Sequence, residues 1–300
     1  MHRTMWQVYQ PLQLFAMHYP EFDHYWQFEL DMRFLGDAGH FLDAVTAFAR
    51  KEPRKQALER STFQQIQDEI GGYSSLQQAV NVAAAGGSYA WGPLRIPDVK
   101  PIGPRPPTDD PLADHFKWGV GEEADVIVTS FCQDVLSSED WVFKDWIGGF
   151  SGKAATPRFF CPPAIGRSSR ALLLAAHEAQ IEKGLHVPSE ATLISFALWH
   201  GLKISYPPQP VFWRQENDAA TRRGWWKGGP LNSTEGIGPK NSNHPGGDGL
   251  SFWWGSAWPK QIVDAWKGVE DDSKGVLPWI LADHNGEIYA PNALLHPVKQ

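Results

Sequence analysis

The amino-acid sequence predicts an α/β fold in which helices cover a sheet. Short segments rich in aromatic and β-branched residues alternate with segments whose apolar residues recur at helical spacing. The strand-like segments lie at residues 25–34, 124–130 and 202–206. The helix-like segments lie at residues 37–51, 168–183 and 191–200. A chain of 300 residues with an apolar share of 42% is long enough for one large core, so we expect a single domain over residues 1–300.

The first predicted strand carries the most informative pattern in the chain, within the segment FDHYWQFELDMRFLG at residues 22–36. Residues two apart on a strand share a face, so Glu29, Asp31 and Arg33 are expected on one side. Two carboxylates at the end of a buried strand need compensation, and Mg²⁺ or Mn²⁺ would provide it because both prefer carboxylate oxygen. The alternative is that Arg33 or a distant lysine pairs with the two acids and no metal binds.

The segments that follow read as helices and then as a long loop. Residues 37–51 form an amphipathic helix pattern that Asp37 can cap and Pro53 ends. Further helical patterns occupy residues 54–70 and 74–85. Residues 92–117 are crowded with proline, which predicts a loop or linker.

Three acids lie close together just before and within the second predicted strand. They are Glu122, Glu123 and Asp125. A cluster of this kind is typical of a solvated turn. Contact with a metal ion or with sugar hydroxyl groups is the alternative interpretation.

The helix predicted at residues 191–200 has an acid at its start. Ser189 is a natural N-cap, and the helix dipole favours a carboxylate such as Glu190 in the first turn. This local role explains Glu190 without any function. The alternative is that Glu190 acts in chemistry, as a carboxylate whose pKa is tuned by a site.

Two features near the end of the chain have open interpretations. Residues 215–256 form a long stretch rich in glycine and tryptophan, which is either an insertion or a lid whose tryptophans stack on a ligand. His296 stands beside Pro297 and is either a surface histidine or a metal ligand.

The composition excludes some classes of protein. The net charge of −7 and the lack of a basic stripe argue against nucleic-acid binding, while 15 tryptophans suit a core and a sugar-handling surface. Cys132 and Cys161 fit no metal-ligand spacing, and we expect buried thiols rather than a disulfide. No run of eighteen apolar residues and no signal-peptide pattern occurs, so the chain as given is expected to be soluble and cytoplasmic, with no membrane segment.

Four segments together resemble a known family. The segments are YWQFELDMRFLG, WGVGEEADVI, SFALWHGLKISYPPQPVF and ALLHPVK. They resemble a fungal family catalogued as domain of unknown function 3405, a distant relative of the GT-A glycosyltransferases. The first segment is also similar to the metal-binding strand of the fungal Golgi α-1,2-mannosyltransferases. The resemblance implies a GT-A-like mixed sheet flanked by helices.

The resemblance also assigns roles to particular residues. It implies a transferase that moves a sugar from a nucleotide-sugar donor to a glycan or small-molecule acceptor. Asp31, Glu29 and His296 would hold Mn²⁺ or Mg²⁺, and Arg33 would lie beside them on the cofactor. Glu190 would orient or deprotonate the acceptor hydroxyl.

One part of the GT-A pattern is largely absent. A Rossmann-like nucleotide-binding half should precede the metal strand, but about two dozen residues cannot hold a βαβ unit of roughly thirty or more. We therefore expect a relative truncated at its N-terminus, whose full-length relatives are anchored in Golgi or other secretory-pathway membranes. An inactive carbohydrate-binding or scaffold protein is the alternative function. A metal-dependent hydrolase is a weaker third interpretation, because no nucleophile is evident.

Overall fold

A four-stranded sheet forms the centre of the molecule. The structure is a computed structural model that describes residues 8–30, 33–35, 38–58, 91–128, 132–136, 141–161 and 165–207, and short strands at 212–213, 249–250, 282–284, 287–289 and 293–295. The central strands run in the order β1 (His24–Phe28), β6 (Ile165–Ser169), β3 (Val126–Val128) and β7 (Ile204–Ser205). β6 pairs antiparallel with both neighbours, whereas β3 and β7 are parallel. The sheet is therefore mixed, and the prediction of an α/β fold is confirmed.

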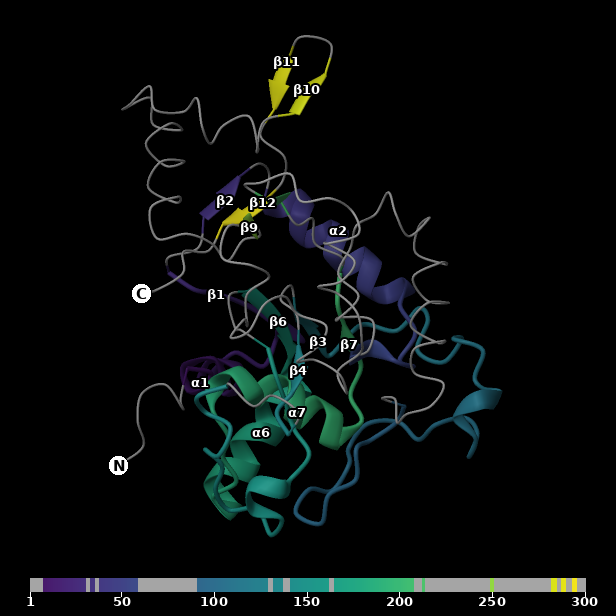
Figure 1. Ribbon diagram of the computed structural model, residues 1–300, viewed down its shortest axis with the longest axis vertical. Helices are drawn as coiled ribbons and strands as arrows, with labels where there is room; N and C mark the ends of the chain where they lie inside the picture. Colours follow the sequence, from purple (N-terminus) through teal and green to yellow (C-terminus); the bar gives the residue numbers. More distant parts are fainter. Residues whose placement is uncertain are drawn as a thin grey trace.

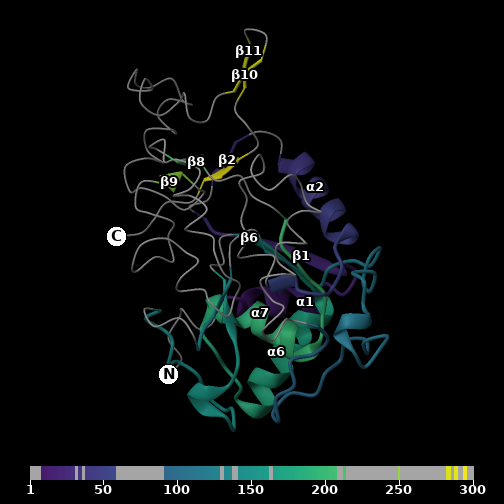
Figure 2. The ribbon, with the colours of Figure 1, turned by 45° about the vertical axis from the view of Figure 1, so that its right-hand side comes forward.

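Helices cover both faces of this sheet. On one face lies α2 (Ala38–Lys51), and on the other lie α6 (Arg170–Lys183) and α7 (Ser189–His200) (Figure 1). Helix α1 (Gln10–His18) packs against α6. Turning the molecule keeps β1 and β6 between α2 and the α6–α7 pair (Figure 2).

The strand register explains what each face of the sheet buries. Trp26 and Ile127 both lie opposite Arg167 of β6, so these residues share one face. Trp26 and Ile127 pack with Ala49 of α2 in a small apolar cluster. The other face, with Tyr25 and Val126, joins the main core against α6 and α7.

The two helices of the main core begin and end as their sequences dictate. The Ser169 hydroxyl accepts the backbone N–H of Leu172 at 3.2 Å and caps α6. Gly184 and Gly201 end α6 and α7 in the left-handed conformation, with φ of 64° and 70°. α7 begins at Ser189, with Pro188 at the cap position, so the expected Ser189 N-cap is displaced by one residue.

The segment predicted as one strand at residues 25–34 is divided into two. β1 ends at Phe28 because its partner β6 begins directly opposite, at Ile165. Leu30 is 99% exposed where the chain leaves the sheet. The chain then forms β2 (Arg33–Leu35), which pairs antiparallel with β12 (Ala293–Leu295) in a separate sheet. The prediction of one continuous strand is therefore wrong.

The remaining described elements are short. They are the strand pairs β4 (Gln133–Asp134) with β5 (Phe159–Phe160), β8 (Phe212–Trp213) with β9 (Gly249–Leu250) and β10 (Ala282–His284) with β11 (Glu287–Tyr289), and the 3₁₀ helices η2 (Pro111–Ala113) and η3 (Lys153–Ala155). Apart from η2, residues 92–117 have irregular backbone. Most of the segment 215–256, expected to be a lid or an insertion, lies outside the described residues.

The two cysteines form a disulfide, which corrects the expectation of free thiols. Antiparallel pairing of β4 with β5 places Gln133 opposite Phe160, so the flanking Cys132 and Cys161 face each other. Both cysteines are buried. The sequence separation of 29 residues carried no sign of this pairing, because the pairing depends on two strands of only two residues each.

None of the described helices is both long enough and apolar enough to cross a membrane.

Candidate functional site

Glu190 lies at the start of α7, and both its backbone carbonyl and its side chain accept hydrogen bonds. Its backbone carbonyl accepts the N–H of Cys161 at 2.8 Å, and its position in the first turn suits a negative charge. The side chain is only partly buried. One carboxylate oxygen, Oε2, accepts the indole N–H of Trp141 at 2.7 Å. The structure thus gives Glu190 both a rigid support and partial access to solvent.

Two further residues share the electrostatic environment of Glu190. Burial raises the pKa of the Glu190 carboxyl, the Trp141 hydrogen bond lowers it, and the charge of Glu29 raises it again. Burial also raises the pKa of the Tyr9 hydroxyl, with further contributions from Glu29 and Glu190. We call Tyr9, Glu29, Trp141 and Glu190 the Glu190 cluster. It joins Glu29, which follows β1, to the first turn of α7.

The strand that leads into this cluster carries an unpaired polar group. The Gln27 carbonyl oxygen Oε1 is buried and has no hydrogen-bond partner among the described residues. Gln27 stands two residues before Glu29. A buried acceptor without a donor is costly. A hydrogen-bond donor, a water molecule or a cation beside the Gln27 oxygen would remove that cost.

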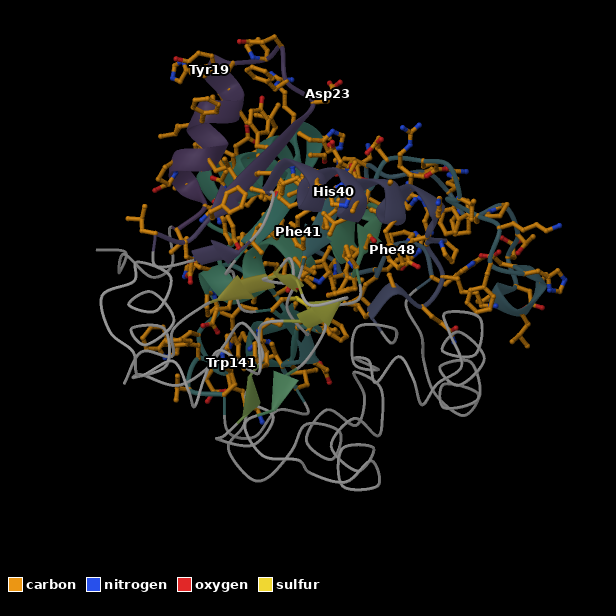
Figure 3. The ribbon with its side chains drawn as sticks, turned by 90° about the horizontal axis from the view of Figure 1, so that it is seen from above. Tyr19, Asp23, His40, Phe41, Phe48 and Trp141 are labelled. Atoms are coloured by element: carbon orange, nitrogen blue, oxygen red, sulfur yellow. A yellow bond between two sulfur atoms is a disulfide. The ribbon has the colours of Figure 1, made fainter. Side chains whose placement is uncertain are left out.

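The indole of Trp141 is held firmly in place. It is 3% exposed, and it stacks on Phe160 of β5 with a ring-centroid distance of 4.3 Å and an interplanar angle of 3°. Phe143 meets it edge-on at 5.8 Å. Cys161, which follows Phe160, ties β5 to the neighbouring segment through the disulfide. Figure 3 shows Trp141 well apart from Phe41 and Phe48 of α2.

The predicted metal ligands are only partly described. Asp31 and His296 lie outside the described residues, and for Arg33 the structure gives the backbone alone. The backbone pairing of β2 with β12 sets Leu295 opposite Arg33. Within the described part of the chain, no three His, Cys, Asp or Glu side chains gather closely enough to hold a metal ion.

The acids expected to form a solvated turn are paired with protein groups. Glu122 accepts Arg54 at 2.7 Å, and Glu123 accepts the buried Arg167 at 2.8 Å. Arg50 approaches Glu123 from the solvent side at 3.3 Å. We call Glu122, Glu123 and Asp125 the acidic turn. The side chains of Glu122 and Glu123 are 45% and 39% exposed, so this turn is solvated and ion-paired at once.

A buried lysine donates hydrogen bonds to the same turn. The Lys203 ammonium donates to the carbonyls of Gly119 at 2.6 Å and Glu122 at 2.7 Å, and the Lys203 backbone N–H donates to Asp125 at 2.8 Å. Burial, reinforced by the charge of Arg54, lowers the pKa of Lys203 to about 8. Lys203 is 0% exposed, so its role is structural.

Sequence reasoning proposed Glu29 and Glu190 as site residues but did not propose Tyr9 or Trp141. Both missed residues lie far from their partners in the sequence, and neither belongs to a spacing pattern that predicts chemistry. The aromatic richness of residues 141–150 was the one available signal, and it is equally typical of a core.

Comparison with known proteins identifies a family. No curated protein matches the chain. No solved structure matches it either. A family model described as "Protein of unknown function (DUF3405)" matches residues 1–300. The chain therefore belongs to the DUF3405 family.

Proposed function

We propose that this protein is a metal-dependent glycosyltransferase that moves a sugar from a nucleotide-sugar to an acceptor hydroxyl. The donor side would consist of Glu29, Asp31 and His296, with Arg33 beside the cofactor. The acceptor side would be Glu190. The proposal rests on the family resemblance of the sequence and on three structural observations.

The observation that carries the proposal is the pairing of β2 with β12. A metal site of this kind requires residues from opposite ends of the chain to meet. Leu295 lies opposite Arg33, so the backbone next to His296 adjoins a residue two positions from Asp31. An inactive scaffold has no need of this proximity.

The donor set suits the ion. Two carboxylates and an imidazole are ligands that Mn²⁺ accepts, and the carboxylates suit Mg²⁺. When bound, such an ion would act as a Lewis acid that stabilises the charge on the departing diphosphate. The unpaired Gln27 oxygen near Glu29 supports a ligand at this edge of the sheet.

The third supporting observation is the electrostatic coupling of Glu29 with Glu190. A transferase needs its donor and acceptor groups within reach of one reacting sugar. Glu29 on the donor side and Glu190 on the acceptor side share one environment. The raised pKa of Glu190 suits a carboxylate that takes a proton from a hydroxyl.

Calorimetry of Mn²⁺ binding tests the proposal. We expect the chain to bind Mn²⁺ more tightly when GDP or UDP is present, and Asp31→Ala to abolish that binding. Asp43→Ala, which removes an exposed carboxylate from α2, is the matched control and should bind as the wild type does.

The opposite result would be equally clear. If a folded wild-type chain binds neither Mn²⁺ nor nucleotide, the transferase proposal fails. A carbohydrate-binding or scaffold function would then be the better account of the tryptophans. If Asp31→Ala binds as the wild type does, the ion is held elsewhere and the proposed ligand set is wrong.

A further inference from the structure

We infer that Trp141 is a positioning residue for Glu190: its indole N–H fixes one carboxylate oxygen and leaves the other free for an acceptor hydroxyl. The inference rests on the proposed function and deepens it. It assigns the acceptor subsite to the Glu190 cluster and gives the reason for the orientation of its acid.

The first step is that Trp141 has almost no freedom to move. Its ring lies flat on Phe160 and is met edge-on by Phe143. Phe160 in turn belongs to β5, which the disulfide ties to the segment before β4. A donor held this rigidly fixes the orientation of the group that it contacts.

The second step is that Glu190 has one oxygen to spare. Oε2 accepts the Trp141 N–H, and no group among the described residues hydrogen-bonds Oε1. No lysine or arginine of the described chain contributes to the pKa of Glu190. Because the side chain is only partly buried, a molecule from solvent can reach it.

The third step is that the surroundings select a neutral donor. Tyr9 is a buried phenol and Glu190 is itself a carboxylate with no cation of the described chain beside it, so an anionic acceptor would be repelled at Glu190. A sugar or other alcohol hydroxyl donates one proton and carries no charge. During transfer, its oxygen would bond to the donor sugar carbon, the nucleoside diphosphate would leave, and the hydroxyl proton would pass to Glu190.

A second indole–carboxylate pair in the molecule provides a matched control. Trp91 donates its N–H to Asp114 at 2.9 Å, much as Trp141 donates to Glu190. Trp91 lies in the hollow beside Arg54 and Trp118 rather than in the Glu190 cluster. Replacing either tryptophan with phenylalanine removes the same hydrogen bond and keeps an aromatic ring.

The experiment compares Trp141→Phe with Trp91→Phe, using GDP-mannose or UDP-glucose as donor and methyl α-mannoside as acceptor. We expect Trp141→Phe to lower kcat for transfer by about ten- to a hundredfold, because a displaced carboxylate no longer meets the hydroxyl. Hydrolysis of the donor by water and binding of Mn²⁺ with nucleotide should stay at the wild-type level. Trp91→Phe should leave all three unchanged.

A measurement without substrate tests the contact by itself. In a ¹⁵N-tryptophan-labelled wild-type chain, we expect Glu190→Gln to shift the Trp141 indole N–H resonance and to leave the Trp91 resonance in place. This arm does not depend on whether Trp141→Phe folds.

Four outcomes would overturn the inference. Wild-type transfer rates in Trp141→Phe would show that Glu190 needs no positioning by the indole. An unmoved Trp141 resonance in Glu190→Gln would show that the contact is not made in solution. A wild-type chain that binds Mn²⁺ with nucleotide but transfers to no acceptor would remove the acceptor role alone, whereas loss of both binding and transfer would remove the proposed function as well.

Discussion

The acidic turn and the Glu190 cluster both contain carboxylates, but the surroundings of these carboxylates differ. In the acidic turn, the acids accept hydrogen bonds or ion pairs from Arg54, Arg167 and the Lys203 backbone N–H. In the Glu190 cluster, the one described donor to Glu190 is the neutral indole of Trp141.

The difference teaches how to separate structural acids from candidate functional acids. The acids of both groups are glutamates or aspartates, and residue type alone does not reveal whether a cation of the protein pairs with them. A carboxylate that forms ion pairs with arginine or lysine side chains of the same protein needs no further ligand to balance its charge. A partly buried carboxylate beside a second acid and without a cation retains that need, and a proton, a metal ion or a hydroxyl can meet it.

The largest expected effect comes from removing the buried cation of the acidic turn. Arg167 is 5% exposed and donates to both Glu123 and the Ala124 carbonyl. We expect Arg167→Met to lower the free energy of unfolding by about 3 kcal/mol, because it removes the buried charged donor that a carboxylate and a backbone carbonyl share. Urea unfolding followed by fluorescence measures this change.

Arg50→Met supplies the control, because Arg50 pairs with the same Glu123. The Arg50 side chain is 58% exposed and its ion pair spans 3.3 Å, so its removal should cost under about 1 kcal/mol. Equal losses from the two arginines would contradict the view that burial of the cation makes this turn structural.

The next effect concerns Lys203, which satisfies backbone carbonyls under the same turn. We expect Lys203→Met to cost about 2 kcal/mol at pH 7, because buried carbonyls lose a charged donor. In the wild type, the pKa of about 8 lies below the ordinary 10.5, so between these values the unfolded chain binds more protons. The free energy of unfolding of the wild type should therefore increase as the pH is raised from about 8 to 10.5. This gain is lost when the pH is lowered again through 8.

The variant should lack this pH dependence. Lys117→Met, which removes an exposed lysine, should keep both the stability and the pH profile of the wild type. A flat wild-type profile between pH 8 and 10.5 would show that Lys203 titrates at its ordinary pKa and that its burial has been overcome by other contacts.

Much of the fold was readable because local signals decide it. The side-chain oxygen of Ser169 caps the start of α6, and the left-handed backbone of Gly184 and Gly201 ends α6 and α7. Each of these helix ends depends on a single residue. Helix α2 follows the amphipathic pattern of its own segment. These features need no knowledge of the rest of the chain.

The features that sequence reasoning missed all depend on distant partners. The strand predicted through residue 34 ends at Phe28 because β6 begins opposite it. Cys132 meets Cys161 only because β4 pairs with β5. At the site, the first turn of a helix explains Glu190 without a function, and the family resemblance alone implies its acceptor role. Its partner Trp141 lies 49 residues away in the sequence and is brought in by tertiary packing.

The smallest expected effects come from replacing one glutamate with glutamine in each of the two groups. The two replacements should change the free energy of unfolding in opposite directions. Glu123→Gln should lower the free energy of unfolding by about 1 kcal/mol, since it weakens the pair with buried Arg167. Glu190→Gln should raise it slightly at pH 7, because the amide keeps an acceptor for Trp141 and removes a charge that burial and Glu29 disfavour.

The pH dependence of Glu190→Gln makes the comparison specific. The pKa of Glu190 is raised above its ordinary 4.5, so wild-type stability is fully present below 4.5 and is lost as the pH rises through the folded-state value. The advantage of the variant should therefore be absent at pH 4 and should appear as the pH rises toward 7, while Glu123→Gln remains destabilising at pH 7. Thermal unfolding of the three proteins across this range measures both trends. A Glu190→Gln variant less stable than the wild type at pH 7 would mean that the charge of Glu190 is already compensated within the protein, and the contrast between the two acid groups would be lost.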